Sequence, residues 1–167
     1  ITMSDIDAEN ITTQSLILEV TQNNQITDPS ETPPTGKVVI KLYPDVAPKH
    51  VAQISMLAKE GFYDGIIFHR VIEGFMAQTG DVQFGNSNSP EFNLSLAGTG
   101  GSDLPNLKAE FTDIAHTRGI ISAARSQDPD SANSQFFICF DSAPHLDRQY
   151  SAFGKVVKGM EFIDKIK

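Results

Sequence analysis

Short stretches in which apolar and polar residues alternate recur along most of the chain. Alternation with a period of two, in stretches rich in β-branched and aromatic residues, is typical of half-buried β-strands. The predicted strands are 15–20, 36–42, 66–72, 75–78, 119–124, 135–140 and 153–157. The break at Glu73-Gly74 separates two of them and predicts a tight turn between paired strands. The chain is therefore expected to be mainly β.

Two segments show the helical period instead. Within residues 44–61, Val51, Ile54, Leu57 and Ala58 recur at helical spacing. Pro48 suits the first helical turn, where its missing N–H is not needed. Residues 159–166 form a second, shorter helical pattern, and 144–146 a single turn. Many short strands with two separated helices favour a closed antiparallel barrel capped by helices.

The remaining segments contain turn-forming residues without periodicity. Residues 1–14 are polar and predict an N-terminal arm, which leaves 15–167 as a single domain. The connection 21–35 is rich in Asn and Pro, and 82–101 is a long segment rich in Gly, Asn and Ser. Loops of that length are usually functional or mobile.

Alternation also assigns faces within the predicted hairpin. Phe68, Arg70 and Ile72 should share one face of the sheet, and His69 and Val71 the other. Arg70 has two interpretations at this point. In the first, it is an ordinary strand arginine paired with a carboxylate. In the second, its planar guanidinium holds several N–H donors in a fixed geometry over an apolar cleft.

Composition changes this picture mainly by exclusion. The 167 residues are 40% hydrophobic and 20% charged, as in a globular domain, and the net charge of −8 argues against nucleic acid or an anionic membrane as main partner. No run of about 18 apolar residues predicts a membrane span. The lone Cys139 excludes an internal disulfide and is expected to be a buried small hydrophobe.

The histidines show no metal-ligand spacing, and no G-x-S-x-G elbow is present, so we expect no metal, no cofactor and no serine nucleophile. His50 is expected to be solvated and His69 to be a satisfied structural histidine. No signal-peptide pattern precedes the domain, and Met3 fits a native start. We therefore expect the cytoplasm, or the periplasm if a signal has been removed.

Three motifs together resemble one family. They are FHRVIEGFMAQTGD at 68–81, SQFFICF at 134–140 and FGKVVKGM at 153–160. Their order and content are similar to those of the cyclophilin-type peptidyl-prolyl cis-trans isomerases, and the resemblance is to bacterial members of that family. The match extends over 36–167. The resemblance implies a closed eight-stranded antiparallel barrel capped by two helices. It also places GTGG, at 98–101, beside a substrate cleft.

The resemblance implies a site and a reaction. Rotation about an X–Pro bond meets a barrier of about 20 kcal/mol that comes from amide resonance, so no nucleophile, metal or cofactor is needed. The implied catalytic residues are Arg70, Phe75 and Gln78. The implied substrate-binding residues are Met76, Ala124, Arg125, Gln135, Phe137, His145, Leu146 and Tyr150. Phe75, Met76, Phe137 and Leu146 would line the proline slot, with core packing as the alternative role.

Three positions depart from the family pattern. His145 stands where many members carry Trp, Tyr150 where they carry His, and Arg125 where many carry Asn. Without an indole donor at position 145, we expect weak cyclosporin binding. The expected function is isomerisation of proline-containing polypeptides in protein folding, by a monomer. The alternatives are a non-catalytic module of the same fold that binds proline segments, and an unrelated acidic interaction domain.

Overall fold

The computed structural model describes residues 2–5, 15–21 and 35–166. The elements, in chain order, are β1 (Thr2–Asp5), β2 (Ser15–Thr21), β3 (Thr35–Leu42), α1 (Pro48–Lys59), β4 (Phe68–Ile72), β5 (Met76–Thr79), β6 (Ile120–Ala123), β7 (Phe136–Cys139), the 3₁₀ helix η1 (Pro144–Leu146), β8 (Ala152–Lys158) and α2 (Met160–Asp164). The predicted mainly-β architecture with two helices is confirmed. The predicted arm and the 21–35 connection lie largely outside the described residues. Within the arm, however, Thr2–Asp5 form a strand against β2.

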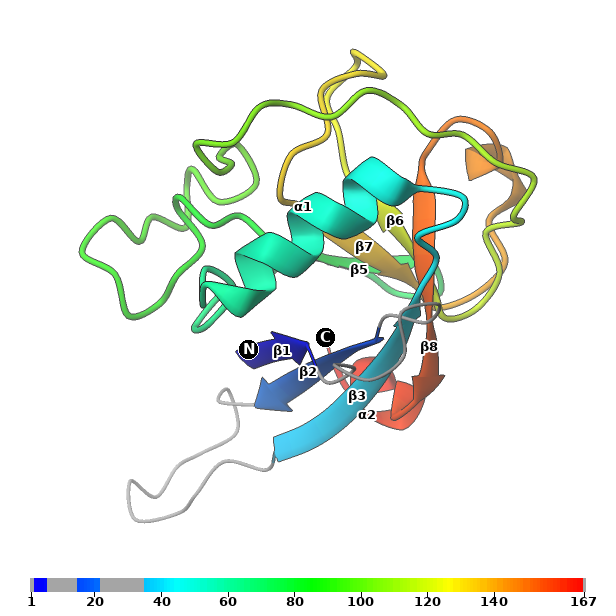
Figure 1. The fold of residues 1–167 in the computed structure, drawn as a ribbon. Helices are drawn as coiled ribbons and strands as arrows, with labels where there is room; N and C mark the ends of the chain where they lie inside the picture. The colour runs from blue at the N-terminus through cyan, green and yellow to red at the C-terminus, as the bar shows by residue number, and fades with distance from the viewer. Residues whose placement is uncertain (1, 6–14, 22–34, 167) are drawn as a thin grey trace.

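The strands form one curled antiparallel sheet in the order β1-β2-β3-β8-β6-β7-β5-β4 (Figure 1). The prediction of a closed barrel was wrong for the described residues, because no pairing joins the end strands β1 and β4. Both end strands are short, with four and five residues, and β4 carries a bulge that bends it. Helix α1 lies close to β1, so it covers that end of the sheet (Figure 1).

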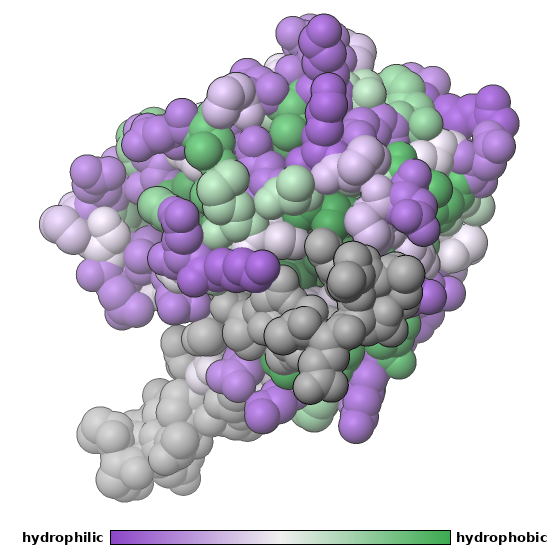
Figure 2. Space-filling view, viewed as in Figure 1, coloured by the Kyte–Doolittle hydropathy of each residue, from purple (hydrophilic) through white to green (hydrophobic). Residues whose placement is uncertain are grey.

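The main core fills the concave side of the sheet under helix α1. The strand β2 turns alternate residues inward, and α1 buries Val51, Ile54, Leu57 and Ala58, as its spacing predicts. Helix α2 adds the fully buried Ile163. Hydrophilic residues make up most of the surface on the face shown in Figure 2, with apolar residues in separate patches.

The start of helix α1 is capped from a distant loop. Pro48 begins the helix, and no side chain at its N-cap residue bonds the free N–H groups. The Glu110 carboxylate accepts the backbone N–H groups of Lys49 and His50 instead, and contacts the His50 ring Nδ1 at 2.6 Å. His50 is only 1% exposed, so the expectation that it is solvated was wrong. A carboxylate 60 residues away in sequence cannot be inferred from the helix itself.

A bulge in β4 overturns the predicted face of Phe68. Phe68 pairs with Thr79, and Arg70 pairs with Gln78, so His69 is an extra residue on this strand. The insertion shifts the alternation by one position. Phe68 therefore packs against the main core, whereas Arg70 faces the opposite side of the sheet.

Candidate functional site

A row of directly paired residues crosses four strands on the convex face of the sheet. Arg70 on β4 pairs with Gln78 on β5, Gln78 pairs with Phe137 on β7, and Phe137 pairs with Ser122 on β6. Directly opposed residues of antiparallel strands point to the same side. The neighbouring strands β4, β5 and β7 therefore present the cation, the amide and the aromatic ring together.

A second apolar cluster surrounds this row, separate from the main core. Its buried members are Met76, Phe137, Cys139, Ala143 and Leu146, with Phe75, Ala124 and Tyr150 packed against them. Tyr150 meets Phe137 edge to face at 5.7 Å between ring centroids, and the exposed His145 lies 5.4 Å from Phe75. The predicted slot residues thus share one cluster, with a rim of aromatic rings.

Cys139 lies at the base of this cluster, where it pairs with Met76. Burial raises the pKa of its thiol to about 12, so the thiolate is scarce at neutral pH. The prediction that Cys139 is a buried small hydrophobe is confirmed.

Arg70 stands exposed at the edge of the cluster. Among the residues that the structure describes, no carboxylate or carbonyl bonds its guanidinium. Within that part of the chain, the interpretation of Arg70 as a salt-bridged strand arginine therefore does not apply. Its donors remain available to a molecule bound over the cluster.

The polar wall of the site is a chain of amide hydrogen bonds. The side-chain Nε2 of Gln78 donates to Gln135 Oε1 at 3.0 Å. Gln135 Nε2 in turn donates to the carbonyl oxygen of Gly100 at 2.8 Å. The two glutamines are 57 positions apart in sequence, and the glycine turn lies in the long loop between β5 and β6. Gln78, at one end of this wall, is the cross-strand partner of Arg70.

Ala124 and Arg125 continue past the end of β6. The Ala124 N–H donates to the Gln135 carbonyl, whereas the backbone N–H and C=O of Arg125 bond nothing among the described residues. The Arg125 side chain donates to the Gln149 carbonyl at 2.6 Å and covers the Tyr150 ring at 4.4 Å. Its guanidinium is thus held at the rim, and its backbone is left free to pair with an extended peptide.

Sequence analysis missed a buried histidine network behind the apolar cluster. His116 is 1% exposed and stacks on Phe137 at 6.3 Å between centroids. Its Nδ1 lies 3.0 Å from Asp147 Oδ1, and its Nε2 lies 2.9 Å from Ser122 Oγ. Because the carboxylate can only accept, Nδ1 carries the proton and the Ser122 hydroxyl donates to Nε2. Burial lowers the pKa of His116, against the opposing effect of Asp147.

No local sequence pattern predicts this network, because His116 lies in a loop, Ser122 in β6 and Asp147 after η1. The same holds for His69, on the other side of the site. Both ring nitrogens of His69 are buried without a hydrogen-bond partner in the described part of the chain, so the expectation of a satisfied histidine was wrong. Burial lowers the pKa of His69.

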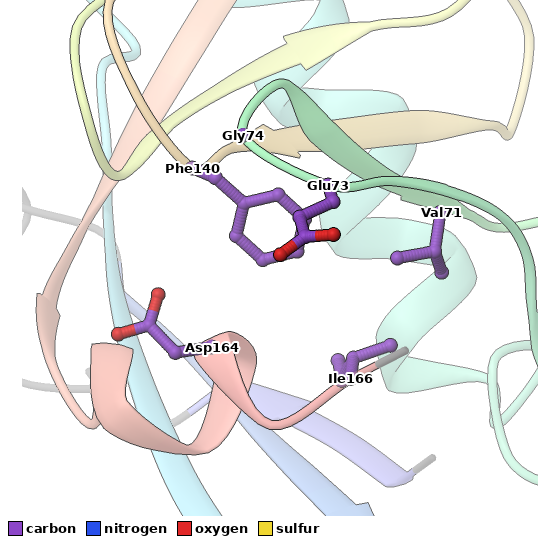
Figure 3. A pocket seen from close by; sticks show the side chains of 6 residues that line it. All are labelled: Val71, Glu73, Gly74, Phe140, Asp164 and Ile166. Carbon is purple, nitrogen blue, oxygen red and sulfur yellow. The ribbon is translucent and has the colours of Figure 1, made fainter.

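A separate pocket lies away from this site, between the β4–β5 turn and helix α2 (Figure 3). It has a volume of about 380 Å³ and contains none of the predicted site residues. Its lining consists of Val71, Glu73, Gly74, Phe140, Asp164 and Ile166. The pocket has two carboxylates, those of Glu73 and Asp164. Arg118 donates two hydrogen bonds to Asp164 and so neutralises one of them.

Within residues 2–5, 15–21 and 35–166, no group of three or more His, Cys, Asp or Glu side chains is arranged to hold a metal ion. None of the helices in that part is long and apolar enough to cross a bilayer.

Comparison with known proteins agrees with this geometry. The family model for cyclophilin type peptidyl-prolyl cis-trans isomerase/CLD matches residues 28–167. A probable peptidyl-prolyl cis-trans isomerase of Brucella suis is 58% identical over 132 residues, which cover 79% of this chain and 67% of that protein. Peptidyl-prolyl cis-trans isomerase B of Bacillus subtilis is 37% identical, over 76% of this chain and 80% of the relative.

A solved structure shows the same fold. It is a cyclophilin type isomerase of Cryptosporidium parvum crystallised in the presence of the dipeptide Ala-Pro. It superposes with a TM-score of 0.66 at 30% identity, covering 77% of each chain. On the family match, the relatives and the shared fold, this chain belongs to the cyclophilin-type peptidyl-prolyl cis-trans isomerases.

Proposed function

We propose that the convex face of β4, β5, β6 and β7 binds a proline-containing polypeptide segment and accelerates rotation about its X–Pro bond. The observation that carries the proposal is that Arg70, which has no ion-pair partner among the described residues, lies in the same cross-strand row as Gln78 and Phe137, next to a separate apolar cluster. The family membership supplies the class of reaction.

The apolar cluster would hold the pyrrolidine ring. Met76, Phe137 and Leu146 are at least 94% buried and would form the bottom of the slot. Phe75 packs against them and would form one of its sides. Burial of the ring in this slot anchors one side of the X–Pro bond. The rest of the segment can then turn while the ring stays fixed.

Arg70 would act on the prolyl nitrogen. Twisting the C–N bond breaks amide resonance and returns a lone pair to that nitrogen, which then accepts a hydrogen bond. In the planar ground state this lone pair is delocalised, so a donor aimed at the nitrogen stabilises the twisted state more than either planar isomer. Such differential binding lowers the barrier. Each 1.36 kcal/mol removed from the barrier raises the rate about tenfold. No covalent intermediate is involved.

The polar groups would hold the peptide beside the ring. Gln78 and Gln135 are tied to each other and to Gly100, so their orientations are set before a segment binds. The free backbone N–H and C=O of Arg125 would pair with the residues that precede the proline. The relative crystallised with Ala-Pro supports a proline-containing ligand.

The decisive experiment is a proline-switch assay on a short peptide with the parent chain, Arg70→Ala and Arg70→Lys. We expect Arg70→Ala to lower kcat/KM by about 100-fold, as loss of a donor aimed at a transition state typically does. Arg70→Lys keeps the charge but loses the fork, so partial activity is expected. Lys158→Ala, which removes an exposed cation from β8, is the control. An inactive parent chain that still binds the peptide would favour the non-catalytic binding module.

Cyclosporin provides a second test at the rim. His145 occupies an exposed position beside Phe75, and an imidazole offers a different donor position from an indole. We expect weak inhibition of the parent and tighter inhibition of His145→Trp. Equal inhibition constants for the two proteins would contradict this assignment.

A further inference from the structure

The last residue of the motif at 68–81, Asp81, is a fully buried carboxylate. Asp81 is 0% exposed and lies just after β5, where the long loop begins. A buried carboxylate is costly unless its oxygens accept hydrogen bonds. The bonds of Asp81 therefore indicate what its burial accomplishes.

The two oxygens of Asp81 hold opposite ends of the loop. Oδ1 accepts the backbone N–H groups of Gln83 and Phe84, at 3.0 and 2.9 Å. Oδ2 accepts those of Gly98 and Gly100, at 2.8 and 3.0 Å. One side chain thus fastens the beginning of the loop to its end, 17 to 19 positions later.

The glycine turn fits this carboxylate closely. A Cβ atom at Gly100 would come within 2.5 Å of Asp81 Oδ1, and Gly98 has φ +100°, which favours glycine. The middle of the loop differs, since Leu94 is 70% exposed. The hydrogen bonds of Asp81 to the loop lie at its two ends, at Gln83 and Phe84 and at Gly98 and Gly100.

The attached end also belongs to the polar wall of the site. The same Gly100 whose N–H donates to Asp81 offers its carbonyl oxygen to Gln135 Nε2 at 2.8 Å. Gln135 Oε1 accepts from Gln78, which is the cross-strand partner of Arg70. An unbroken series of hydrogen bonds thus leads from Asp81 to the residue beside the cation.

We infer that Asp81 is a positioning residue, which fixes the Gly100 carbonyl and through it the side-chain amides of Gln135 and Gln78. The expected effect of Asp81 on catalysis rests on the proposed function, whereas its effect on the orientation of the amides does not. Because the amides are oriented before a segment binds, loss of the carboxylate should disorder them in the free protein as well. A merely structural Asp81 would stabilise the loop without affecting these amides.

The test uses Asp81→Asn, which keeps the size of the side chain but turns an NH₂ group towards N–H donors. We expect kcat and kcat/KM to fall together by about tenfold, as for an interaction needed in the transition state. Asp130→Asn is the matched control, because Asp130 also accepts a backbone N–H, that of Ala109, but in another loop. Asn93→Ala, which removes a turn contact to Ser95 inside the long loop, is the second. Both controls should keep parental kinetics.

A double-mutant cycle separates positioning from general stability. If Asp81 acts through Gln135, then Asp81→Asn should cost little further activity in a Gln135→Ala background. If the double variant loses activity by the product of the two single losses, the inference is overturned. It is also overturned if Asp81→Asn keeps the kcat and KM of the parent.

A readout that needs no activity is the NMR signal of the Gln135 side-chain amide. We expect this signal to shift in Asp81→Asn and to stay in place in Asp130→Asn. An unchanged signal in a folded Asp81→Asn protein would overturn the inference even if the parent chain proved inactive. If Asp81→Asn does not fold, deletion of 87–92 replaces it, because this deletion keeps Asn93 and Leu96, which bond to the two attached ends. The amide signal should then stay as in the parent, and its displacement would count against the inference.

Discussion

One buried and one partly buried histidine lie behind the two walls of the site, and they are held in opposite ways. His116, behind the apolar wall, has a carboxylate on one ring nitrogen, a hydroxyl on the other and Phe137 stacked on its face. His69, near the polar wall, has no hydrogen-bond partner on either nitrogen among the described residues and lies beneath Gly98.

The comparison shows that the two walls owe their order to different interactions. The apolar wall is supported by a saturated network of side chains. The polar wall adjoins backbone N–H groups that donate to Asp81, whereas its histidine makes no side-chain hydrogen bond within the described part of the chain. We therefore expect loss of the histidine to weaken the apolar wall and to leave the polar wall intact.

The largest expected effect comes from His116→Leu. This substitution leaves the buried Ser122 hydroxyl without its partner and removes the ring stacked on Phe137. We expect the free energy of unfolding to fall by about 2–3 kcal/mol, measured by urea denaturation. A loss below about 1 kcal/mol would mean that the network does not support the apolar wall.

His69→Leu applies the same substitution to the other wall. Removal of polar atoms that have no partner is nearly neutral or stabilising, so we expect a change between zero and a gain of about 1 kcal/mol. The measurement is again urea denaturation, side by side with the His116 variant. If both variants lose the same stability, the contrast between the two histidines fails.

The smallest expected effect is a difference in pH dependence. Burial lowers the pKa of both histidines below the value of about 6.5 expected in the unfolded chain, although Asp81 opposes this at His69 and Asp147 at His116. As the pH falls from about 6.5 towards the lowered pKa values, the unfolded state takes up protons that the folded state does not. Stability must therefore decrease on acidification through this window.

His69→Leu removes one of these two contributions. Its stability should decline less than that of the parent as the pH is lowered through the same window, measured as the urea midpoint at several pH values. Identical pH profiles for parent and variant would show that His69 titrates as freely when folded as when unfolded.

Much of the fold could be predicted from local patterns. The spacing of Val51, Ile54 and Leu57 predicted helix α1, and alternation predicted the strands to within a few residues. Alternation failed at His69, because a bulge needs one extra residue and the sequence does not mark which one. Closure of the sheet also could not be predicted, since it depends on whether two distant edges meet.

The site was predicted by resemblance more than by chemistry. The motif positions named Arg70, Gln78 and Phe137, and pairing across β4, β5 and β7 brings them into one row. Their catalytic and binding roles stay predictions until the variants are assayed, as do the compartment and the monomeric state.

The sequence by itself determined the family, the main elements and which residue types could act on a proline amide, because these depend on local spacing and motif content. Only the tertiary structure decided that Arg70 has no ion-pair partner within residues 2–5, 15–21 and 35–166, that His116 is saturated and that Asp81 joins two ends of a loop. The physical reason is that each of these facts depends on partners far apart in the chain. A hydrogen bond or ion pair is made by atoms within about 3 Å, whatever their separation in sequence.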